Sequence, residues 1–274
     1  MSALGSSHKV GDYHGSKRPL EAERERLRLL AAALDPGTQR RMRALGIGPG
    51  WRCLEIGAAE GSMTRWMAEQ VGPSGCVVAC DIDLRFLAEL RLPNVEVREL
   101  DVRSAPIEEA SFDLAYCRTL LLHLPDPDAV LAKLVRSLRP GSWLLAEDSD
   151  MCVSLAADPD HPDAELFESV HRRIWSHVRA TKRFDTKLGR TLPPRLRALG
   201  LVDVGFEASA GFQSGGGPAA ELHRRNFGVN LRAMILEAGV VSERELERVL
   251  ALYADPGFGS LAGLNVAVWG RRPA

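Results

Sequence analysis

The chain has 274 residues, a formal net charge of −1, and 45% hydrophobic and 26% charged residues. A chain of this length buries roughly three-quarters of its unfolded surface, so one large α/β domain can fold without a disulfide or metal. The near-neutral charge argues against a constitutive nucleic-acid binder, which needs a broad basic face. No apolar run approaches the roughly 20 residues of a membrane span. Residues 1–16 lack the apolar centre of a signal peptide, so we expect a cytoplasmic protein.

The predicted elements begin with a charged helix over residues 21–34. Short apolar runs then predict strands over 51–56, 76–81, 95–100, 112–117, 143–148, 201–207 and 263–269. Helical patterns cover 61–71, 83–91, 126–138, 219–238 and 242–253. Near-continuous apolar strands that alternate with helices indicate an α/β fold, with a doubly wound, mostly parallel seven-stranded sheet covered on both faces.

The cysteine pattern indicates a reducing compartment. The five cysteines include no CxxC pair, and four of them lie in apolar, strand-like runs: Cys53, Cys76, Cys80, Cys117 and Cys152 are the full set. We therefore expect buried free thiols. No spacing of histidines or carboxylates resembles a metal site, and His171 and His177, six residues apart, do not share a helix face.

The segment most informative about chemistry follows the first predicted strand. An apolar run ends in an acid, a turn of small residues comes next, and a helix then begins: residues 54–62 read Leu-Glu-Ile-Gly-Ala-Ala-Glu-Gly-Ser. Small residues let a ligand lie against the backbone at the carboxyl edge of a parallel sheet. The sequence therefore predicts a ligand site at this edge.

Two further acids end the next two predicted strands. Asp81 lies twenty residues past Gly61, where a carboxylate can accept hydrogen bonds from both hydroxyls of a ribose. Asp101 follows the third strand, where it can accept a hydrogen bond from an exocyclic amine such as that of adenine. One acid at a strand end is often a solvated loop residue or a helix cap. Acids at three successive strand ends beside one glycine turn favour an adenosyl ligand.

This set of residues resembles the class I S-adenosylmethionine (SAM)-dependent methyltransferases, and the resemblance is strongest over residues 45–150. It rests on Glu55, Gly57, Ala59, Gly61, Asp81 and Asp101. The resemblance implies the Rossmann-like methyltransferase fold and SAM as cofactor. It assigns the methionine part of SAM to the glycine turn, the ribose to Asp81 and adenine to Asp101. It further places Ile82 and Val102 on either side of the adenine ring, and Arg118 near the methionine end.

One position departs from the family pattern. Ala59 stands where the family more often has glycine. If its φ is positive, alanine costs on the order of 1 kcal/mol there. Residues 45–150, the His-Leu-Pro of residues 123–125 and the Val-Trp-Gly-Arg-Arg of residues 268–272 are similar to bacterial small-molecule methyltransferases of secondary metabolism.

Three segments interrupt the regular alternation, and the family topology places them at the carboxyl edge. We expect an N-terminal helical lid (1–45), the SAM-binding half of the domain (46–149), a helical cap insertion (150–187), and the C-terminal half of the sheet (188–274) with a helical insertion over 210–255. Two helical stripes in the cap contain aromatic residues and histidines, notably Trp175, His223 and Phe227. These stripes form either the core of the cap or an apolar substrate pocket.

A hydroxyl acceptor benefits from a general base, which is worth roughly 10²–10⁴-fold in rate, whereas an amine or carboxylate acceptor can react without one. The candidates are His123, His171, Glu147 and Asp148. His123 lies on the loop after the fourth strand, where it is either a base or a packed structural histidine. Glu147 and Asp148 end the fifth strand, where ordinary strand-end acids are also expected.

We therefore expect an enzyme that transfers the methyl group of SAM to oxygen or nitrogen of a small molecule. A peptide or nucleic-acid methyltransferase is one alternative, although the Tyr-Cys-Arg-Thr of residues 116–119 lacks the Asn/Asp-Pro-Pro-aromatic signature of amino-group methylases on bases. A SAM-binding scaffold protein without turnover is another. A nicotinamide-dependent reductase is disfavoured, because its GxGxxG pattern is absent. A homodimer is compatible with the sequence, and no membrane partner is expected.

Overall fold

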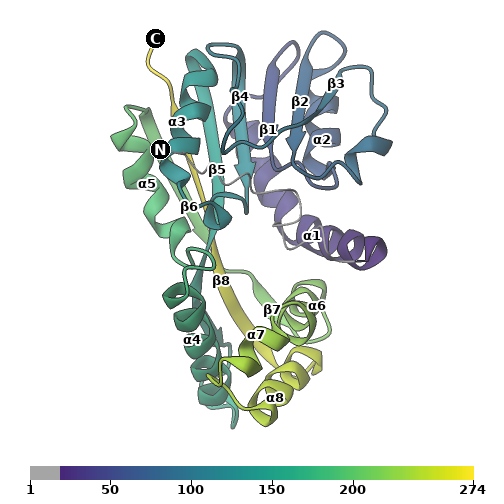
Figure 1. Ribbon diagram of the computed structural model, residues 1–274, viewed down its shortest axis with the longest axis vertical. Coiled ribbons are helices and arrows are strands. Elements are labelled where there is room, and N and C mark those ends of the chain that lie inside the picture. Colours follow the sequence, from purple (N-terminus) through teal and green to yellow (C-terminus); the bar gives the residue numbers. More distant parts are fainter. Residues whose placement is uncertain (1–18) are drawn as a thin grey trace, which may run out of the picture.

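A computed structural model describes residues 19–274. The prediction about a signal peptide in residues 1–16 and the start of the predicted lid lie outside these residues. The upper half of the molecule is a sheet covered by helices, and the lower half is a group of helices around two strands that extend out of the sheet (Figure 1). No helix among residues 19–274 is both long and apolar enough to cross a bilayer.

The sheet confirms the predicted fold class. Its strands lie in the order β3-β2-β1-β4-β5-β8-β6, and a short β7 also pairs with β8. Strands β1 to β5 pair in parallel, whereas β8 is antiparallel to β5, β6 and β7. The bounds are β1 Arg52–Ile56, β2 Cys76–Asp81, β3 Val95–Glu99, β4 Phe112–Arg118, β5 Leu138–Ala156, β6 Val202–Ser209, β7 Phe212–Ser214 and β8 Gly259–Arg271.

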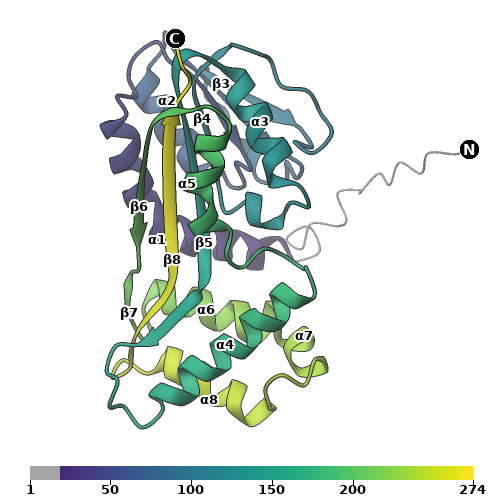
Figure 2. The same cartoon turned by 90° about the vertical axis from the view of Figure 1, so that its left-hand side faces the viewer.

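The helices cover both faces of the sheet and form the cap. Their bounds are α1 Leu20–Ala44, α2 Ser62–Val71, α3 Pro127–Ser137, α4 Ala164–Ala180, α5 Leu188–Ala198, α6 Pro218–Arg225, α7 Arg232–Glu237 and α8 Glu243–Ala254. A π-helix, Asn226–Asn230, joins α6 to α7. The side view shows α4, α6, α7 and α8 gathered beyond the end of the sheet toward which β5 and β8 extend (Figure 2).

Strand alternation divides the core between the two faces of the sheet. Leu54 and Ile56 of β1 pack toward α3 and α5, whereas Cys53 packs toward α2 with Met67. Successive side chains of a strand point to opposite faces of the sheet. A strand with few polar residues therefore has buried side chains on both faces. A separate apolar cluster, which contains Phe167, Trp175 and Tyr253, forms the core of the cap.

Several predicted elements differ in the structure. The helix predicted over 83–91 is wrong, because this segment holds only one 3-10 turn, Leu87–Glu89. Asp83 accepts the backbone N–H of Arg85 in a local turn, which competes with helix formation. The helix predicted over 219–238 is interrupted by the π-helix around Gly228. The strand predicted over 143–148 runs from Leu138 to Ala156, since β8 pairs with it into the cap.

The cysteines largely follow the expectation. All five are free thiols. Cys53, Cys80 and Cys117 are buried and Cys76 is half-buried, but Cys152 is exposed. Burial raises the pKa of the Cys80 thiol to about 12, and burial also raises the pKa values of Cys53 and Cys117. The three buried thiols are therefore protonated at neutral pH.

Candidate functional site at the carboxyl edge of the sheet

The turn after β1 has the left-handed backbone that its small residues predict. Gly57, Ala59 and Gly61 have φ angles of 79°, 51° and 76°. A Cβ on Gly61 would lie 3.0 Å from a Leu87 methyl group, so this position is tight as well as left-handed. Ala59 therefore meets the condition for strain, which costs about 1 kcal/mol. The turn leads directly into α2, whose N-cap residue is Gly61.

Asp81 is tied to this turn. Its carboxylate accepts the backbone N–H of Ala59 at 2.8 Å and that of Asp83 at 3.0 Å. Burial raises the pKa of Asp81, and the hydrogen bonds from Asp83 and Ala59 oppose the rise. The end of β2 and the strained residue of the turn are thus joined by one carboxylate.

A hollow of about 40 Å³ lies between the turn, the end of β4 and helix α1. One wall is the apolar face of α1, and the others come from β1, its turn and β4. The lining residues are Leu27, Leu30, Ala31, Glu55, Gly57, Ala58, Ala59, Glu60, Ser62, Tyr116, Arg118 and Thr119.

Two charged residues of opposite sign lie in this wall. Glu55 is buried and accepts a hydrogen bond from the Thr64 hydroxyl. Burial raises the pKa of Glu55 to about 7, against the effects of Thr64 and Arg118. Arg118 donates to Asp35 of α1 at 2.7 Å and to the Thr38 hydroxyl at 3.0 Å. The hollow therefore offers a carboxyl that titrates near neutrality and a guanidinium that also contacts α1.

Tyr116 supplies an orphaned polar atom beside these two residues. Its hydroxyl is buried and makes no hydrogen bond within residues 19–274. Burial raises its pKa well above the usual value, so the hydroxyl is protonated. A buried hydroxyl without a partner costs about 1–3 kcal/mol. The left-handed cradle, the paired charges and this hydroxyl fit a ligand that carries both polar groups and charge.

The predicted adenine residues lie on the neighbouring loops and do not line the hollow. Ile82 follows Asp81 and is half-buried, whereas Val102 is buried in the main core. Asp101 pairs with Arg103 at 2.8 Å, and this hydrogen bond lowers the pKa of Asp101. Lys133 of α3 donates to the Val102 carbonyl at 2.8 Å, which fixes this loop to the sheet domain.

Glu147 and Asp148 lie at the predicted edge but have structural partners. The Oε1 atom of Glu147 accepts from Arg41 at 2.7 Å, and its Oε2 atom accepts from Thr38 at 2.6 Å. Asp148 accepts the backbone N–H of Leu122 at 3.1 Å and that of Ser149 at 3.0 Å. Burial raises the pKa of Asp148 to about 7. Both carboxyl groups are fully buried and neither lines the hollow.

The two histidines proposed as bases have contrasting surroundings. His123 is exposed, and its ring meets that of Phe184 edge to face with centroids 5.5 Å apart. His171 is buried in the cap, where Nδ1 lies 2.6 Å from the Phe167 carbonyl and Nε2 lies 2.8 Å from the Tyr253 hydroxyl. Burial lowers the pKa of His171 to about 4, so it is neutral at pH 7.

The residues predicted to bind substrate belong to the aromatic core of the cap. The Trp175 and Phe227 rings lie 5.3 Å apart, and both are buried. His223 is half-buried and stacks on Tyr253 at 5.6 Å. Burial lowers the pKa of His223 to about 4. Trp175 and Phe227 thus form cap core, which was one of the two interpretations of the helical stripes, and none of these three residues lines the hollow.

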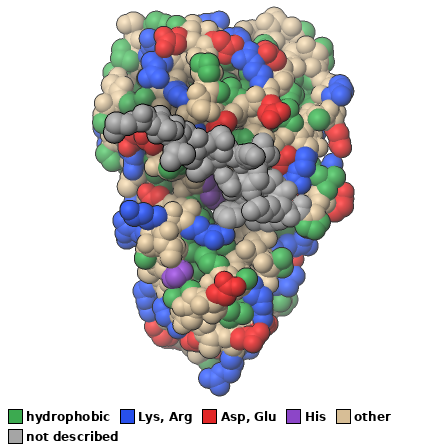
Figure 3. Space-filling view, viewed as in Figure 1, with side chains coloured by type: hydrophobic (Ala, Val, Ile, Leu, Met, Phe, Trp, Pro, Cys, Tyr) green, Lys and Arg blue, Asp and Glu red, His purple; other side chains and the backbone are tan. Residues whose placement is uncertain are grey.

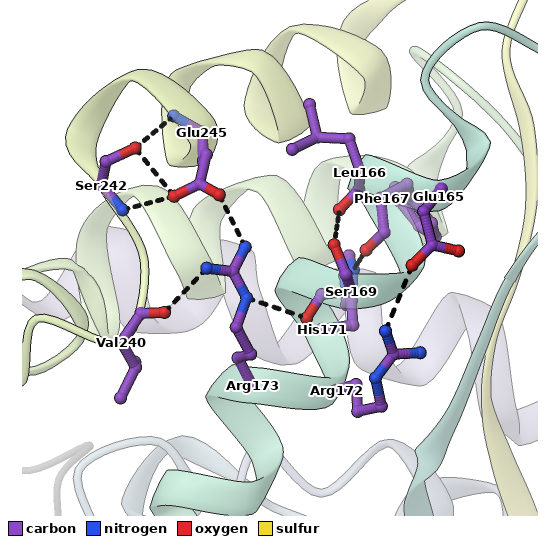
Figure 4. A network of polar contacts seen from close by, with 10 residues as sticks. All are labelled: Glu165, Leu166, Phe167, Ser169, His171, Arg172, Arg173, Val240, Ser242 and Glu245. Carbon is purple, nitrogen blue, oxygen red and sulfur yellow. Dashed lines mark hydrogen bonds and ion pairs between the residues drawn. The ribbon is translucent and has the colours of Figure 1, made fainter.

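Polar contacts hold the outer part of the cap together (Figure 4). Arg173 of α4 donates to Glu245 of α8 at 2.7 Å and to the Val240 carbonyl at 3.1 Å. Glu245 also completes the capping box of α8 with Ser242. The hydrogen bond from Arg173, together with those from Ser242, lowers the pKa of Glu245 to about 2. This network supports the cap and does not touch the hollow.

Helix α1 supplies a part of the site that the sequence pattern did not predict. The helix predicted over 21–34 continues to Ala44, which brings Asp35, Thr38 and Arg41 against the sheet. Pro36 and Gly37 are typical of a helix end, so the extension was hidden. A signal was present in Leu27, Leu30 and Ala31, whose spacing places them on one face. Tyr116 was also available, because it shares a strand face with Arg118.

Known proteins are similar to the central part of this chain. Residues 54–146 match the family described as a methyltransferase domain. Methyltransferase str2 of Strobilurus tenacellus is 33% identical over 156 residues, which are 54% of this chain and 52% of that protein. Trans-aconitate 2-methyltransferase of Deinococcus radiodurans is 29% identical over 161 residues, 55% of this chain and 58% of that protein. The chain thus spans about half the length of these curated relatives.

Solved structures share the fold. Phosphoethanolamine N-methyltransferase 2 of Haemonchus contortus, in complex with phosphomonomethylethanolamine and S-adenosylhomocysteine (SAH), gives a TM-score of 0.54 at 16% identity, over 85% of this chain and 51% of that one. The YcgJ protein of a Bacillus species gives 0.55 at 16% identity, over 86% and 97% of the chains. Residues 54–146 thus match a methyltransferase domain, and the chain shares the fold of these solved structures.

Proposed function

We propose that this protein binds SAM in the hollow beside the turn after β1 and transfers its methyl group to a small molecule. The observation that carries the proposal is the joint placement of three features at one sheet edge. These are the left-handed turn, the opposed charges of Glu55 and Arg118, and the unpartnered Tyr116 hydroxyl. SAM is zwitterionic at its methionine end and carries a positive charge on its sulfur, so it has a partner for each of these groups.

Different residues would bind different parts of SAM. The methionine end would be held by Glu55, Arg118 and the backbone of Gly57 and Ala59. Asp81 would accept hydrogen bonds from the ribose hydroxyls near Gly61. Asp101, Ile82 and Val102 would surround the adenine on the loops after β2 and β3. The apolar face of α1 at Leu27 and Leu30 excludes water from the hollow.

When bound, SAM supplies a methyl group on a cationic sulfur, so the protein's main task is to align the acceptor and exclude water. His123 is the candidate base that we favour, because its ring is exposed, whereas Glu147, Asp148 and His171 are buried. His123→Ala should lower turnover more than SAM affinity. Full activity of this variant would remove His123 from the mechanism.

The acceptor is a small molecule in this proposal, with methylation on oxygen or nitrogen. Support comes from the names of two relatives, trans-aconitate 2-methyltransferase and ubiquinone biosynthesis O-methyltransferase. Residues 123–125 and 268–272 resemble enzymes of bacterial secondary metabolism, and we extend the proposal to such a pathway. Acidic and basic side chains intermingle on the face shown in Figure 3, which favours a small acceptor over a polyanion.

The test is incubation of the purified protein with SAM labelled in its methyl group and a panel of phenols, carboxylic acids and amines. Label should move to one acceptor class, and SAH should form in equal amount. Saturable SAM binding without transfer to any acceptor would favour a scaffold. Transfer to a peptide or nucleic acid instead would replace the proposed acceptor class.

A further inference from the structure

Helix α1 is anchored to the molecule differently at its two ends. Its C-terminal part contacts the sheet through buried groups: Thr38 and Arg41 both bond Glu147, and Met42 is fully buried in the core. Buried, doubly bonded charge pairs are costly to break. Residues 38–44 are therefore fixed to the sheet.

The N-terminal part of α1 covers the hollow. Leu27, Leu30 and Ala31 form one of its walls. Ion pairs to the sheet domain on this part are long, with Arg24 3.4 Å from Glu89 and Arg28 3.5 Å from Glu60, and one partner in each is largely exposed. Such exposed pairs hold a helix weakly. Helix α1 also packs against α6 of the cap, so it lies between the two halves of the molecule (Figures 1 and 2).

Pro36 and Gly37 lie between the two parts, within one continuous helix. Pro36 lies inside α1 and has no N–H to donate to the Ala32 carbonyl. Gly37 follows, and a Cβ there would lie 3.0 Å from the Arg41 guanidinium. Proline weakens the helical hydrogen-bond ladder, and glycine adds backbone freedom. This pair therefore provides a natural pivot next to the fixed end.

One ion pair joins the movable part to the wall of the hollow. Asp35, directly before the pivot, accepts from Arg118 at 2.7 Å, and the two side chains are only 15% and 11% exposed. Arg118 also bonds Thr38, on the fixed side of the pivot. A guanidinium has five N–H donors, so these two bonds leave others for a ligand. Arg118 can therefore contact the lid helix, the fixed helix and a bound anion at once.

Resting on the proposed function, we propose that residues 20–35 form a lid that pivots at Pro36-Gly37, and that Asp35 is the positioning residue that latches it. Asp35 holds Arg118 toward the hollow while the lid is closed. Opening the lid breaks the Asp35–Arg118 pair and uncovers the site between Leu27 and the turn. Ligand and lid then stabilise each other, since coupling between two sites is reciprocal.

The test combines hydrogen–deuterium exchange of the full chain with the dissociation rate of SAH. In the native protein, SAH should slow exchange of residues 20–35 at least about fivefold and leave residues 38–44 nearly unchanged. Asp35→Asn should speed exchange of 20–35 without ligand and speed SAH release roughly 5- to 20-fold, the usual range of coupling between sites. Asp128→Asn on α3, which loses an exposed ion pair with Arg195 of α5, is the matched control and should behave as native.

Pro36→Ala provides a second, opposite variant. The restored N–H can bond the Ala32 carbonyl, so exchange of residues 20–35 in the ligand-free protein should fall at least about threefold. If SAH binds with native affinity but leaves the exchange of residues 20–35 unchanged, the lid proposal is wrong, whereas the proposed function stands. Failure of SAH to bind overturns both. If residues 20–35 exchange equally fast in ligand-free Asp35→Asn and in the ligand-free native protein, Asp35 is not a latch, whatever the effect of SAH on exchange.

Discussion

The carboxyl edge of the sheet and the core of the cap both contain polar side chains among apolar ones, but they use them in opposite ways. In the cap, His171 has a partner on each ring nitrogen, and its neighbours are aromatic rings. At the sheet edge, the Tyr116 hydroxyl has no partner and the backbone is left-handed at Gly57 and Ala59. Satisfied polar groups stabilise a fold, whereas unsatisfied groups and strain around a hollow indicate a ligand site.

This contrast predicts that mutations in the cap change stability and mutations at the edge change ligand affinity. The largest effect should come from Phe167→Ala, which empties a fully buried position between His171, Tyr253 and Phe258. Loss of this ring should lower the free energy of unfolding by about 3–5 kcal/mol. Urea titration measures the change, and SAH calorimetry on the folded variant should show native affinity. Lost SAH affinity in a folded variant would place the acceptor or cofactor in the cap.

The second-largest effect should come from Asp81→Ala at the carboxyl edge of the sheet. It removes the acceptor of the Ala59 N–H and the predicted ribose contact. We expect SAH affinity to fall about 100-fold, equivalent to about 2.7 kcal/mol, as for a lost charged hydrogen-bond partner. Calorimetry measures this, with Asp203→Asn, an exposed residue paired with Arg271, as control. Unchanged affinity would remove the ribose assignment.

A smaller effect should appear in the pH dependence of SAM binding. Burial raises the pKa of Glu55 to about 7, so it is mostly neutral at pH 6 and mostly ionised at pH 7.5. A cationic ligand prefers the ionised form, so SAM affinity should rise by up to about eightfold over this range. Glu55→Gln should flatten the profile. A native profile that is flat or falls would place the positive part of the ligand elsewhere.

The smallest effect tests strain in the turn. Ala59 has a φ of 51°, a conformation that glycine adopts without steric cost. Ala59→Gly should therefore stabilise the protein by at most about 0.5 kcal/mol, because the strain that is relieved is largely offset by the greater flexibility of glycine in the unfolded chain. Thermal unfolding with and without SAH measures the change. Destabilisation instead would mean that the Ala59 methyl group contributes packing that outweighs the strain.

The sequence predicted the sheet and the glycine turn because both depend on local pattern. Apolar strands, strand-end acids and small residues occur in order along residues 51–148. The contacts that α1 makes with the sheet at the candidate site could not be predicted from local pattern. Arg41 and Glu147 are far apart in the chain, and Pro36-Gly37 suggests a helix end, yet packing against the sheet carries the helix through it.

In the cap, the buried helix faces could be predicted from the sequence, but the groups that they pack against could not. The stripes through Trp175, His223 and Phe227 were visible, but periodicity reports only that one face is buried and does not say against what. The neighbours are other cap helices, so the aromatic residues pack on each other. Whether they also reach an acceptor stays a prediction, as does each functional role given to a site residue.

Titration calorimetry of the purified protein with SAH is the decisive measurement. We expect saturable binding at one site, with a dissociation constant in the micromolar range, about 100-fold weaker in Asp81→Ala and unchanged in Asp203→Asn. No heat of binding for SAH or SAM, or equal affinity in the Asp81 variant, would contradict the claim that the hollow beside the turn after β1 holds the adenosyl ligand.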